Sequence, residues 1–502
     1  MLAGVSRGVP SREQRPRMLS LIRDVSLRSG GIMTSVIPEV VRFAAENTKE
    51  AGDVLGVGTE RRVRWAQGII ERGPVDGTIF YAGEMYPVMG YSEGAFRMLR
   101  RVEGLMGINE LAKVAPIMRK LGIYTVSVNA LWGGINKKYE RALQDAVKVL
   151  KGLGVGIGYL FEEEPPSGVA LHTYGLLREF REHASWVHRR LKDLGVRRII
   201  TLDPIVATAF RLYYPEFVRD WNIEAYHFVE VVAERIAELG LRFDLGRRLR
   251  VTYHDPCYLA RTLGVVDEVR FILSRIDGVE LVEPARRGIF TGCSGDGGLE
   301  LTQPQVARRV SLDRVEELRR TGAELVLTSC PACMLMLRTG FETIGHEVDV
   351  WDLASLLAEA MGNARKEDPV RPEFRRYRVF PRSPRFESLS LDDLAYVLMR
   401  ETDRCKKCGF CNVECPTSKA MGRLESRSSR GRMTLINSLV RGDPVRPREV
   451  LDRLYTCVLC GRCSQECPAG LHAQELIVYG RAYAIYSGAL LRGGDQLALD
   501  GR

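Results

Sequence analysis

The chain has 502 residues, a length that predicts two or three domains because a single hydrophobic core rarely serves so long a chain. Apolar residues make up 45% of it and charged residues 27%, as in an ordinary globular protein. No apolar run approaches the roughly 18 residues that cross a bilayer, and the first residues lack the apolar core of a secretory signal. We therefore expect a cytoplasmic protein without a membrane span, which would be peripheral to a membrane only through a partner.

The net charge of +10 favours an acidic partner surface, but its densest cluster is the proline-containing stretch RPEFRRYRVFPRSPR (371–385). That composition predicts a solvated basic linker over residues 363–388. Nucleic acid is not expected as a partner, because no binding motif or row of aromatic residues accompanies the charge.

In chain order, residues 1–74 are expected to form an N-terminal extension and a helical lead-in, with Met18 and Met33 as alternative starts. Farther on, apolar β-branched runs alternate with helical patterns, which predicts parallel sheets with flanking helices, an α/β fold. The clearest predicted strands are RLRVTY, RGIF and AELVL, which end at residues 253, 290 and 327. Helices are expected between them at 266–276 and 304–320.

An internal repeat divides this α/β region in two. RIITLDPIVATAFR (198–211) aligns with LVLTSCPACMLMLR (325–338), which lies 127 residues later. A duplication at a fixed offset predicts two copies of one unit, over residues 75–240 and 241–362. The first copy has no cysteine, so we expect it to keep the fold without the metal.

Other residue types replace the cysteines in the first copy. The 127-residue offset places Asp203 at the position of Cys330 and Ala130 at that of Cys257; it also gives Val206 for Cys333 and Pro166 for Cys293. The Ala130 assignment depends on aligning YTVSVNA (124–130) with the first strand. The alternative counterpart of that strand is TIFYAGEMYPVMG (78–90).

Four cysteines of the second copy follow its predicted strands. They are Cys257, Cys293, Cys330 and Cys333. The carboxyl ends of parallel strands meet at one edge of a sheet, so these thiols should converge there. A disulfide framework is not expected in a large intracellular chain, which leaves metal binding as their predicted role.

The second copy resembles the cysteine-rich CCG domain of heterodisulfide reductase catalytic subunits and of glycolate or lactate oxidase iron-sulfur subunits. The resemblance is based on the motifs HDPC, CSGDGG and TSCPAC. It implies that the four cysteines ligate a metal. Ser294 stands where the family has a second adjacent cysteine. Four thiolates suit a [4Fe-4S] cluster, while zinc or a non-cubane cluster with Ser294 remains an alternative. His254 could donate a hydrogen bond or a proton near this centre, or only shape its turn.

The remaining eight cysteines form two runs, CKKCGFCNVECP (405–416) and CVLCGRCSQECP (457–468). Each has the spacing C-x2-C-x2-C-x3-C-P, in which three thiolates wrap one cubane and the fourth reaches the other cluster. Two [4Fe-4S] clusters are therefore predicted, with crossed ligand sets. The first set is Cys405, Cys408, Cys411 and Cys467; the second is Cys457, Cys460, Cys463 and Cys415.

Between the runs, MTLINSLV (433–440) and PREVLDRLY (447–455) have helical periodicity. With SSRGRM (428–433), these features resemble the all-α dicluster ferredoxin domain of heterodisulfide reductase and glycolate oxidase subunits, here over 389–490. In several relatives the two domains come in the opposite order.

These resemblances imply an oxidoreductase subunit that relays electrons between an FAD-bearing flavoprotein and an acceptor. The flavoprotein would resemble a 2-hydroxyacid dehydrogenase or the flavin subunit of a heterodisulfide reductase, and the acceptor would be a quinone, reached through a membrane partner, or a thiol-disulfide carrier. Two alternatives remain open. The centre at Cys257, Cys293, Cys330 and Cys333, with His254, could itself be catalytic and reduce a disulfide. It could instead hold zinc, which would make the α/β region a docking module beside an electron-carrying ferredoxin domain.

Overall fold

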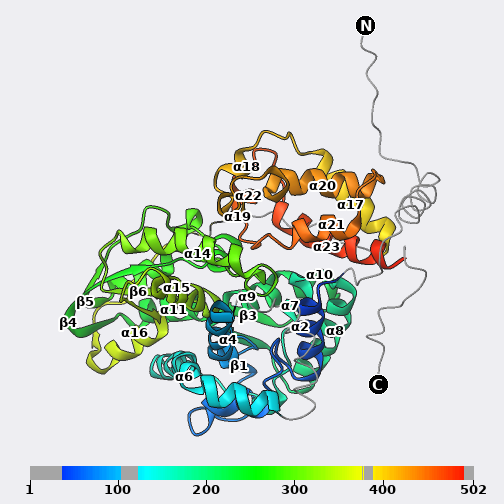
Figure 1. The fold of residues 1–502 in the computed structure, drawn as a ribbon. Helices are drawn as coiled ribbons and strands as arrows, with labels where there is room; N and C mark the ends of the chain where they lie inside the picture. Colours follow the sequence, from blue (N-terminus) through cyan, green and yellow to red (C-terminus); the bar gives the residue numbers. More distant parts are fainter. Residues whose placement is uncertain (1–36, 103–122, 376, 378–387, 491–502) are drawn as a thin grey trace. The chain divides into compact units, whose positions relative to one another are not determined.

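The computed structural model describes residues 37–102, 123–375, 377 and 388–490. They form two compact units (Figure 1). Among the described residues, an α/β unit comprises 39–102, 123–171, 179–375 and 377, and a helical unit comprises 37–38, 172–178 and 388–490. Met18, Met33 and residues 376 and 378–387 of the predicted basic linker lie outside the described residues.

The first sheet of the α/β unit has three parallel strands in the order β1-β2-β3. They are β1 (Thr78–Tyr81), β2 (Arg198–Thr201) and β3 (Glu224–His227). The alignment of YTVSVNA with a strand was wrong, because this segment lies within the long helix α6 (Ile123–Gly152). The alternative is confirmed in that Thr78–Tyr81 forms the strand, buried along its length and paired in parallel with β2.

The second sheet has the order β5-β4-β6-β7, and β8 pairs with β4 in antiparallel fashion. Its strands are β4 (Leu241–Tyr253), β5 (Ile276–Leu281), β6 (Leu325–Thr328), β7 (Asp349–Asp352) and β8 (Arg365–Lys366). The strands predicted to end at 253 and 327 are confirmed. The RGIF strand was wrong: Gly288–Phe290 forms a 3-10 turn, because Gly288 has φ 55°, which an extended strand does not accommodate.

The registers of the two sheets show which residues correspond. Arg198 of β2 pairs with Thr78 of β1, just as Leu325 of β6 pairs with Val251 of β4. Thr78 therefore corresponds to Val251. Counting forward from this pair, the residue that corresponds to Cys257 is Glu84 and not Ala130.

Helices connect and flank the strands, and the predicted helices at 266–276 and 304–320 are confirmed. In the described segments, no helix combines the length and the apolar character that crossing a membrane requires. Besides α6, the helices up to residue 360 are α2 (Glu39–Glu50), α3 (Thr59–Val63), α4 (Met89–Val102), α7 (Val169–Thr173), α8 (Leu177–Asp193), α9 (Pro204–Thr208), α10 (Tyr214–Phe217), α11 (Phe228–Leu239), α12 (Asp267–Ser274), α13 (Leu299–Thr302), α14 (Pro304–Arg319), α15 (Pro331–Thr343) and α16 (Leu353–Ala360).

The second unit contains helices and, in its described part, no strand, so the all-α prediction is confirmed. Both predicted inter-run helices form, as α20 and α21. The helices are α17 (Leu391–Asp403), α18 (Phe410–Val413), α19 (Pro416–Ala420), α20 (Ser429–Arg441), α21 (Pro447–Leu454), α22 (Arg462–Gln465) and α23 (Ala473–Leu490).

A short segment from the middle of the chain, His172–Arg178, also belongs to this helical unit. The Arg178 amide donates to the Tyr486 hydroxyl at 2.9 Å, and its guanidinium lies 4.2 Å from the centre of that ring. Gly175 has φ 84° and no room for a side chain, because a Cβ there would lie 2.6 Å from the Cβ of Arg481. The segment is therefore packed closely against α23.

Candidate metal centres

The cysteines of the α/β unit stand at the carboxyl ends of neighbouring strands. Cys257 follows β4 after a short turn and begins a π-helical turn, Tyr258–Thr262. Cys330 follows β6 and is the N-cap of α15, whose first turn carries Cys333. Two residues three positions apart at a helix start lie on one face, which explains why the Cys330 and Cys333 thiols are neighbours.

The glycine-rich loop 292–298 brings Cys293 to the same place. The Ser294 hydroxyl donates to Cys333 Sγ at 3.3 Å, and the Gly295 amide donates to Cys293 Sγ at 3.4 Å. Cys293, Cys330 and Cys333 are buried, whereas Cys257 is partly exposed. Burial, and then the neighbouring Cys333 thiol, raise the pKa of Cys330 well above its ordinary value.

Hydrogen bonds and ion pairs hold these loops. Asp255 forms a bidentate ion pair with Arg270 and accepts the Gly288 amide at 2.7 Å, so it fixes the turn before Cys257. Buried Arg261 donates to the Thr291 carbonyl at 2.7 Å and thereby holds the residue that precedes the cysteine loop. The donors are soft thiols, three of them buried, on loops held by these contacts; thiolates are the ligand type that iron-sulfur clusters and zinc prefer.

In the helical unit, the two cysteine runs have the same backbone conformation. Lys407 and Leu459, each just before the second cysteine of its run, have φ 54° and 49°. Gly409 and Gly461 then begin short helices from left-handed conformations. Positive φ at non-glycine residues is costly, and such strain is concentrated at functional sites. Each run therefore curls its first three cysteines around one point.

The first run closes around a small cavity. Its lining includes thiols from both runs: Cys405, Cys408, Cys411, Cys463 and Cys467. Burial raises the pKa of Cys411 to about 11; the Ser429 hydroxyl opposes this shift, and the thiols of Cys405, Cys415 and Cys467 add to it. Cys467, from the end of the second run, thus lies beside the first run.

The second run is more deeply buried, with Cys457, Cys460 and Cys463 all less than 10% exposed. Burial raises the pKa of Cys463 well above its ordinary value, and Cys457, Cys460 and Cys415 contribute to this shift. Cys415, from the end of the first run, therefore lies close to the second run. The positions of Cys467 and Cys415 agree with the crossed ligand sets, which remain a prediction. Among the described residues, no group of three or more His, Cys, Asp or Glu side chains is arranged to hold a single metal ion.

Comparison with known families matches both regions. Residues 251–338 match the cysteine-rich domain known as CCG, and residues 401–471 match the 4Fe-4S dicluster domain. The chain contains a CCG domain and a 4Fe-4S dicluster domain. These domains cover the cysteines that the sequence singled out.

Several curated proteins are similar to part of the chain. The chain is 30% identical over 265 residues to the EtfAB:quinone oxidoreductase of Syntrophomonas wolfei, covering 51% of this chain and 37% of that protein. It is 32% identical over 223 residues to one of the subunits of the dihydromethanophenazine:CoB–CoM heterodisulfide reductase of Methanosarcina mazei, covering 43% and 54%. It is 30% identical over 232 residues to the probable iron-sulfur-binding oxidoreductase FadF of Bacillus subtilis, covering 46% and 33%. The chain thus spans about half or less of the length of these relatives.

His254 of the CCG domain is buried, and its ring is held from one side. Arg314 Nε donates to His254 Nδ1 at 2.9 Å. Burial first, and then the charges of Arg314 and Arg261, lower the pKa of His254 well below its ordinary value. The ring is therefore neutral and carries its proton on Nε2. Its assignment as a proton carrier stays a prediction.

The cysteine-less copy has hydrogen-bonding side chains at two of the four positions that correspond to cysteines of the CCG domain. Glu84, the counterpart of Cys257, accepts hydrogen bonds from the Ser167 amide at 3.0 Å and from its hydroxyl at 2.5 Å. Asp203, the counterpart of Cys330, accepts the Ile205 amide at 2.8 Å and caps α9. Both carboxyls are fully buried. In the first copy, hydrogen bonds therefore hold the loops that correspond to the cysteine-bearing loops of the second copy.

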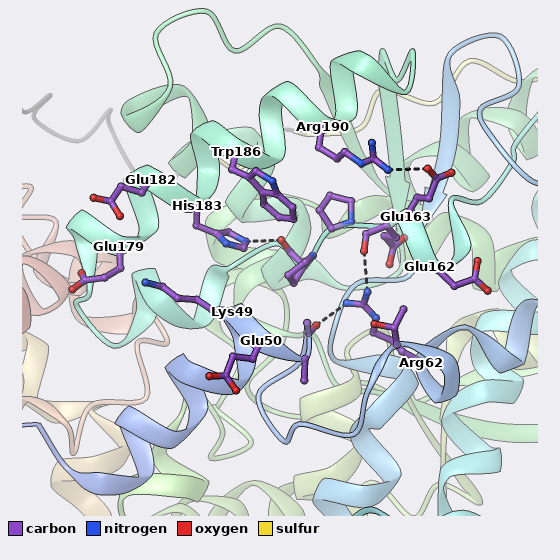
Figure 2. Close-up of a pocket in the computed structure, with 16 residues that line it drawn as sticks. Lys49, Glu50, Arg62, Glu162, Glu163, Glu179, Glu182, His183, Trp186 and Arg190 are labelled. Atoms are coloured by element: carbon purple, nitrogen blue, oxygen red, sulfur yellow. Dashed lines mark hydrogen bonds and ion pairs between the residues drawn. The ribbon is translucent and has the colours of Figure 1, made fainter. Parts of the chain in front are cut away.

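A cavity of about 560 Å³ in the α/β unit was not predicted from the sequence (Figure 2). His183 Nε2 lies 2.8 Å from the Pro166 carbonyl, and Arg190 pairs with Glu163 at 2.8 Å. Arg62 crosses the floor and donates to the Gly52 carbonyl at 2.6 Å. These residues are far apart in the sequence, so no local pattern marks the cavity.

Proposed function

We propose that the chain is an iron-sulfur electron-transfer subunit of a multi-subunit oxidoreductase. It relays electrons between a flavoprotein partner and a quinone or thiol-disulfide acceptor. The observation that supports the proposal most is that thiols of both runs come together in the dicluster domain. Cys467 lines the cavity at the first run, and Cys415 interacts with Cys457 and Cys463 of the second run as well as with Cys411 of the first.

Cys405, Cys408, Cys411 and Cys467 would hold one [4Fe-4S] cluster, and Cys457, Cys460, Cys463 and Cys415 the other. Each cluster, when bound, accepts and releases electrons singly. The protein provides thiols, excludes water around the second set, and donates backbone N–H groups to sulfur, such as Leu459 N to Cys457 Sγ at 3.4 Å. Such donors stabilise negative charge on sulfur and so influence the potential.

The third centre is proposed at Cys257, Cys293, Cys330 and Cys333, with [4Fe-4S] favoured over zinc or a non-cubane cluster. The partner assignment has support from the relatives, whose names include a quinone oxidoreductase, a heterodisulfide reductase and an iron-sulfur-binding oxidoreductase. A flavoprotein donor would carry the two-electron organic chemistry, because the CCG and dicluster domains have no nucleotide loop of their own.

The crossed arrangement can be tested with two serine variants of the anaerobically purified chain. Cys467→Ser should change the EPR signal of the cluster at the first run, and Cys415→Ser that of the cluster at the second. Cys408→Ser and Cys460→Ser identify the two signals, because each of these residues belongs to its own run in any arrangement. If Cys467→Ser instead changes the same signal as Cys460→Ser, the clusters are not crossed.

Ser294→Cys tests whether residue 294 lies beside the metal of the third centre. Because the Ser294 hydroxyl touches Cys333 Sγ, a thiol at this position would adjoin the metal and should alter its spectrum. Ser311→Cys is the control, since Ser311 is a buried serine whose hydroxyl donates to the Met336 carbonyl. An unchanged spectrum in Ser294→Cys would exclude Ser294 as the reason for any difference between this centre and that of family members with a second adjacent cysteine.

A further inference from the structure

Two arginines are almost fully buried in the helical unit that contains the dicluster domain. Arg432 on α20 and Arg481 on α23 are each 1% exposed. Removing a guanidinium from water is costly unless an opposite charge and hydrogen bonds compensate for it. Their surroundings therefore indicate what each charge acts on.

Arg432 is held by neutral groups next to a predicted cluster ligand. Its Nη2 donates to the hydroxyls of Thr417 at 2.9 Å and Thr456 at 2.8 Å, and its Nε donates to the Arg453 carbonyl at 3.1 Å. Its Nη1 lies 3.9 Å from Cys415 Sγ. In the described part of the chain, no carboxylate pairs with Arg432. Its charge is thus directed to the thiols of the second set.

Arg481 approaches the same set from another helix. Its Nη2 donates to the carbonyls of Leu454 at 2.8 Å and Cys457 at 2.9 Å, and its Nη1 donates to the Thr173 carbonyl at 2.6 Å. The guanidinium also lies 5.0 Å from the centre of the Tyr455 ring. One side chain therefore joins the 172–178 segment to the backbone of a predicted ligand.

The positive charges near the first set are more exposed or are paired. Lys406 and Lys407 are exposed, and Arg430, which lines the first-run cavity, is 34% exposed and forms an ion pair with Glu425 at 2.7 Å. Solvent and salt screen a surface ammonium strongly, whereas a charge buried in a medium of low dielectric acts at nearly full strength. The two clusters should consequently respond very differently to the loss of a nearby cation.

We propose that Arg432, assisted by Arg481, raises the reduction potential of the cluster at Cys415, Cys457, Cys460 and Cys463. A cluster held by four thiolates is negatively charged, and its reduction adds one electron and no proton. A fixed buried cation stabilises the reduced form more than the oxidised form. This inference rests on the proposed function, since it requires that cluster.

The test is an EPR-monitored redox titration of the full chain with dithionite. Arg432→Gln removes the charge and keeps a hydrogen-bonding side chain. At a fixed potential, the ratio of reduced to oxidised second cluster should fall about tenfold or more, which corresponds to about 59 mV for a one-electron couple. Arg432→Lys, which keeps the charge, should retain most of the wild-type ratio. Arg481→Gln should shift the ratio in the same direction as Arg432→Gln and provides the test if the latter does not assemble.

Lys406→Gln is the matched control, because it removes a positive charge beside the first set but from an exposed position. It should change the ratio of either cluster less than about twofold. A wild-type ratio in Arg432→Gln with full iron content would overturn the role of the arginine and leave the proposed function intact. Wild-type protein without iron at the two runs would instead overturn the proposed function.

Discussion

At the residue scale, the two copies of the α/β unit differ at the positions of the cysteines. Glu84 corresponds to Cys257, and it joins its own loop to that of Ser167 through two hydrogen bonds. A carboxylate that accepts two buried donors can hold two loops together without a metal. This accounts for a first copy that retains its parallel sheet although it contains no cysteine.

Glu84→Ala should lower the free energy of unfolding by on the order of 2 kcal/mol, because it leaves the buried amide and hydroxyl of Ser167 without their acceptor. Ser167→Ala removes only the hydroxyl and should have a smaller effect. Urea unfolding of the two variants under argon measures the difference. Equal stability of Glu84→Ala and the wild type would contradict the role of these hydrogen bonds.

Glu164 predicts a pH dependence. Burial raises the pKa of this carboxyl to about 8, although the charge of Arg62 and the amides of Ala82 and Gly83 oppose the shift. The folded protein keeps the proton up to about pH 8, whereas the unfolded chain releases it near the ordinary pKa of 4.5. The unfolded state thus binds fewer protons in between, and the contribution of Glu164 to the free energy of unfolding falls as the pH rises through this window.

Glu164→Gln should remove this loss, because a glutamine does not titrate. Between about pH 5.5 and about pH 8.5, the stability of the wild type should therefore fall relative to the variant by on the order of 2 kcal/mol. Unfolding curves at several pH values provide the comparison. Parallel pH profiles would show that Glu164 is ionised in the folded state at neutral pH.

At the element scale, α4 and α6 pack at a point that only glycine permits. A Cβ on Gly90 would lie 2.2 Å from Asn136 Cα on α6. Asn136 Oδ1 accepts the Gly90 amide at 3.0 Å, and its Nδ2 donates to the Pro87 carbonyl at 2.8 Å. The side chain of one helix thereby satisfies an N–H at the start of the other, which the helix cannot satisfy by itself.

Gly90→Ala should force these helices apart and destabilise the chain by roughly 1–3 kcal/mol. Gly134→Ala is the control on α6, because a Cβ there meets no atom within 4 Å. Alanine is the better helix former, so this variant should be as stable as the wild type or up to about 1 kcal/mol more stable. Thermal unfolding compares the two, and equal losses would argue against the close contact.

The helices α4 and α6 also explain why the sequence could not identify Glu84 as the counterpart of Cys257. The offset of 127 residues correctly aligns β2 with β6, since their Asp203 and Cys330 both precede a proline that starts a helix. It fails before β2 because α4 and α6 lie between β1 and β2, and the second copy has a shorter connection there. Only the strand pairing restores the alignment. The strand predicted for RGIF (287–290) failed for a local reason, because Gly288 has a positive φ.

At the scale of the whole molecule, the cysteine motifs and the family resemblances based on them predicted both kinds of cysteine-bearing domain. The family matches over 251–338 and 401–471 confirm them. The place of His172–Arg178 in the helical unit could not be predicted, because its partners on α23 lie about 300 residues later. Contacts over such a separation leave no periodicity in the sequence.

The number of metal atoms per chain tests the central claim most directly, which is that the chain carries electrons through two cubanes and a third iron-sulfur centre. Anaerobically purified protein should contain about twelve irons and about twelve sulfides per chain. About eight irons with one zinc would assign the CCG domain a docking role and restrict electron transfer to the dicluster domain. Protein whose cysteine runs hold zinc, or that contains no iron and sulfide when prepared and reconstituted without oxygen, would contradict the account.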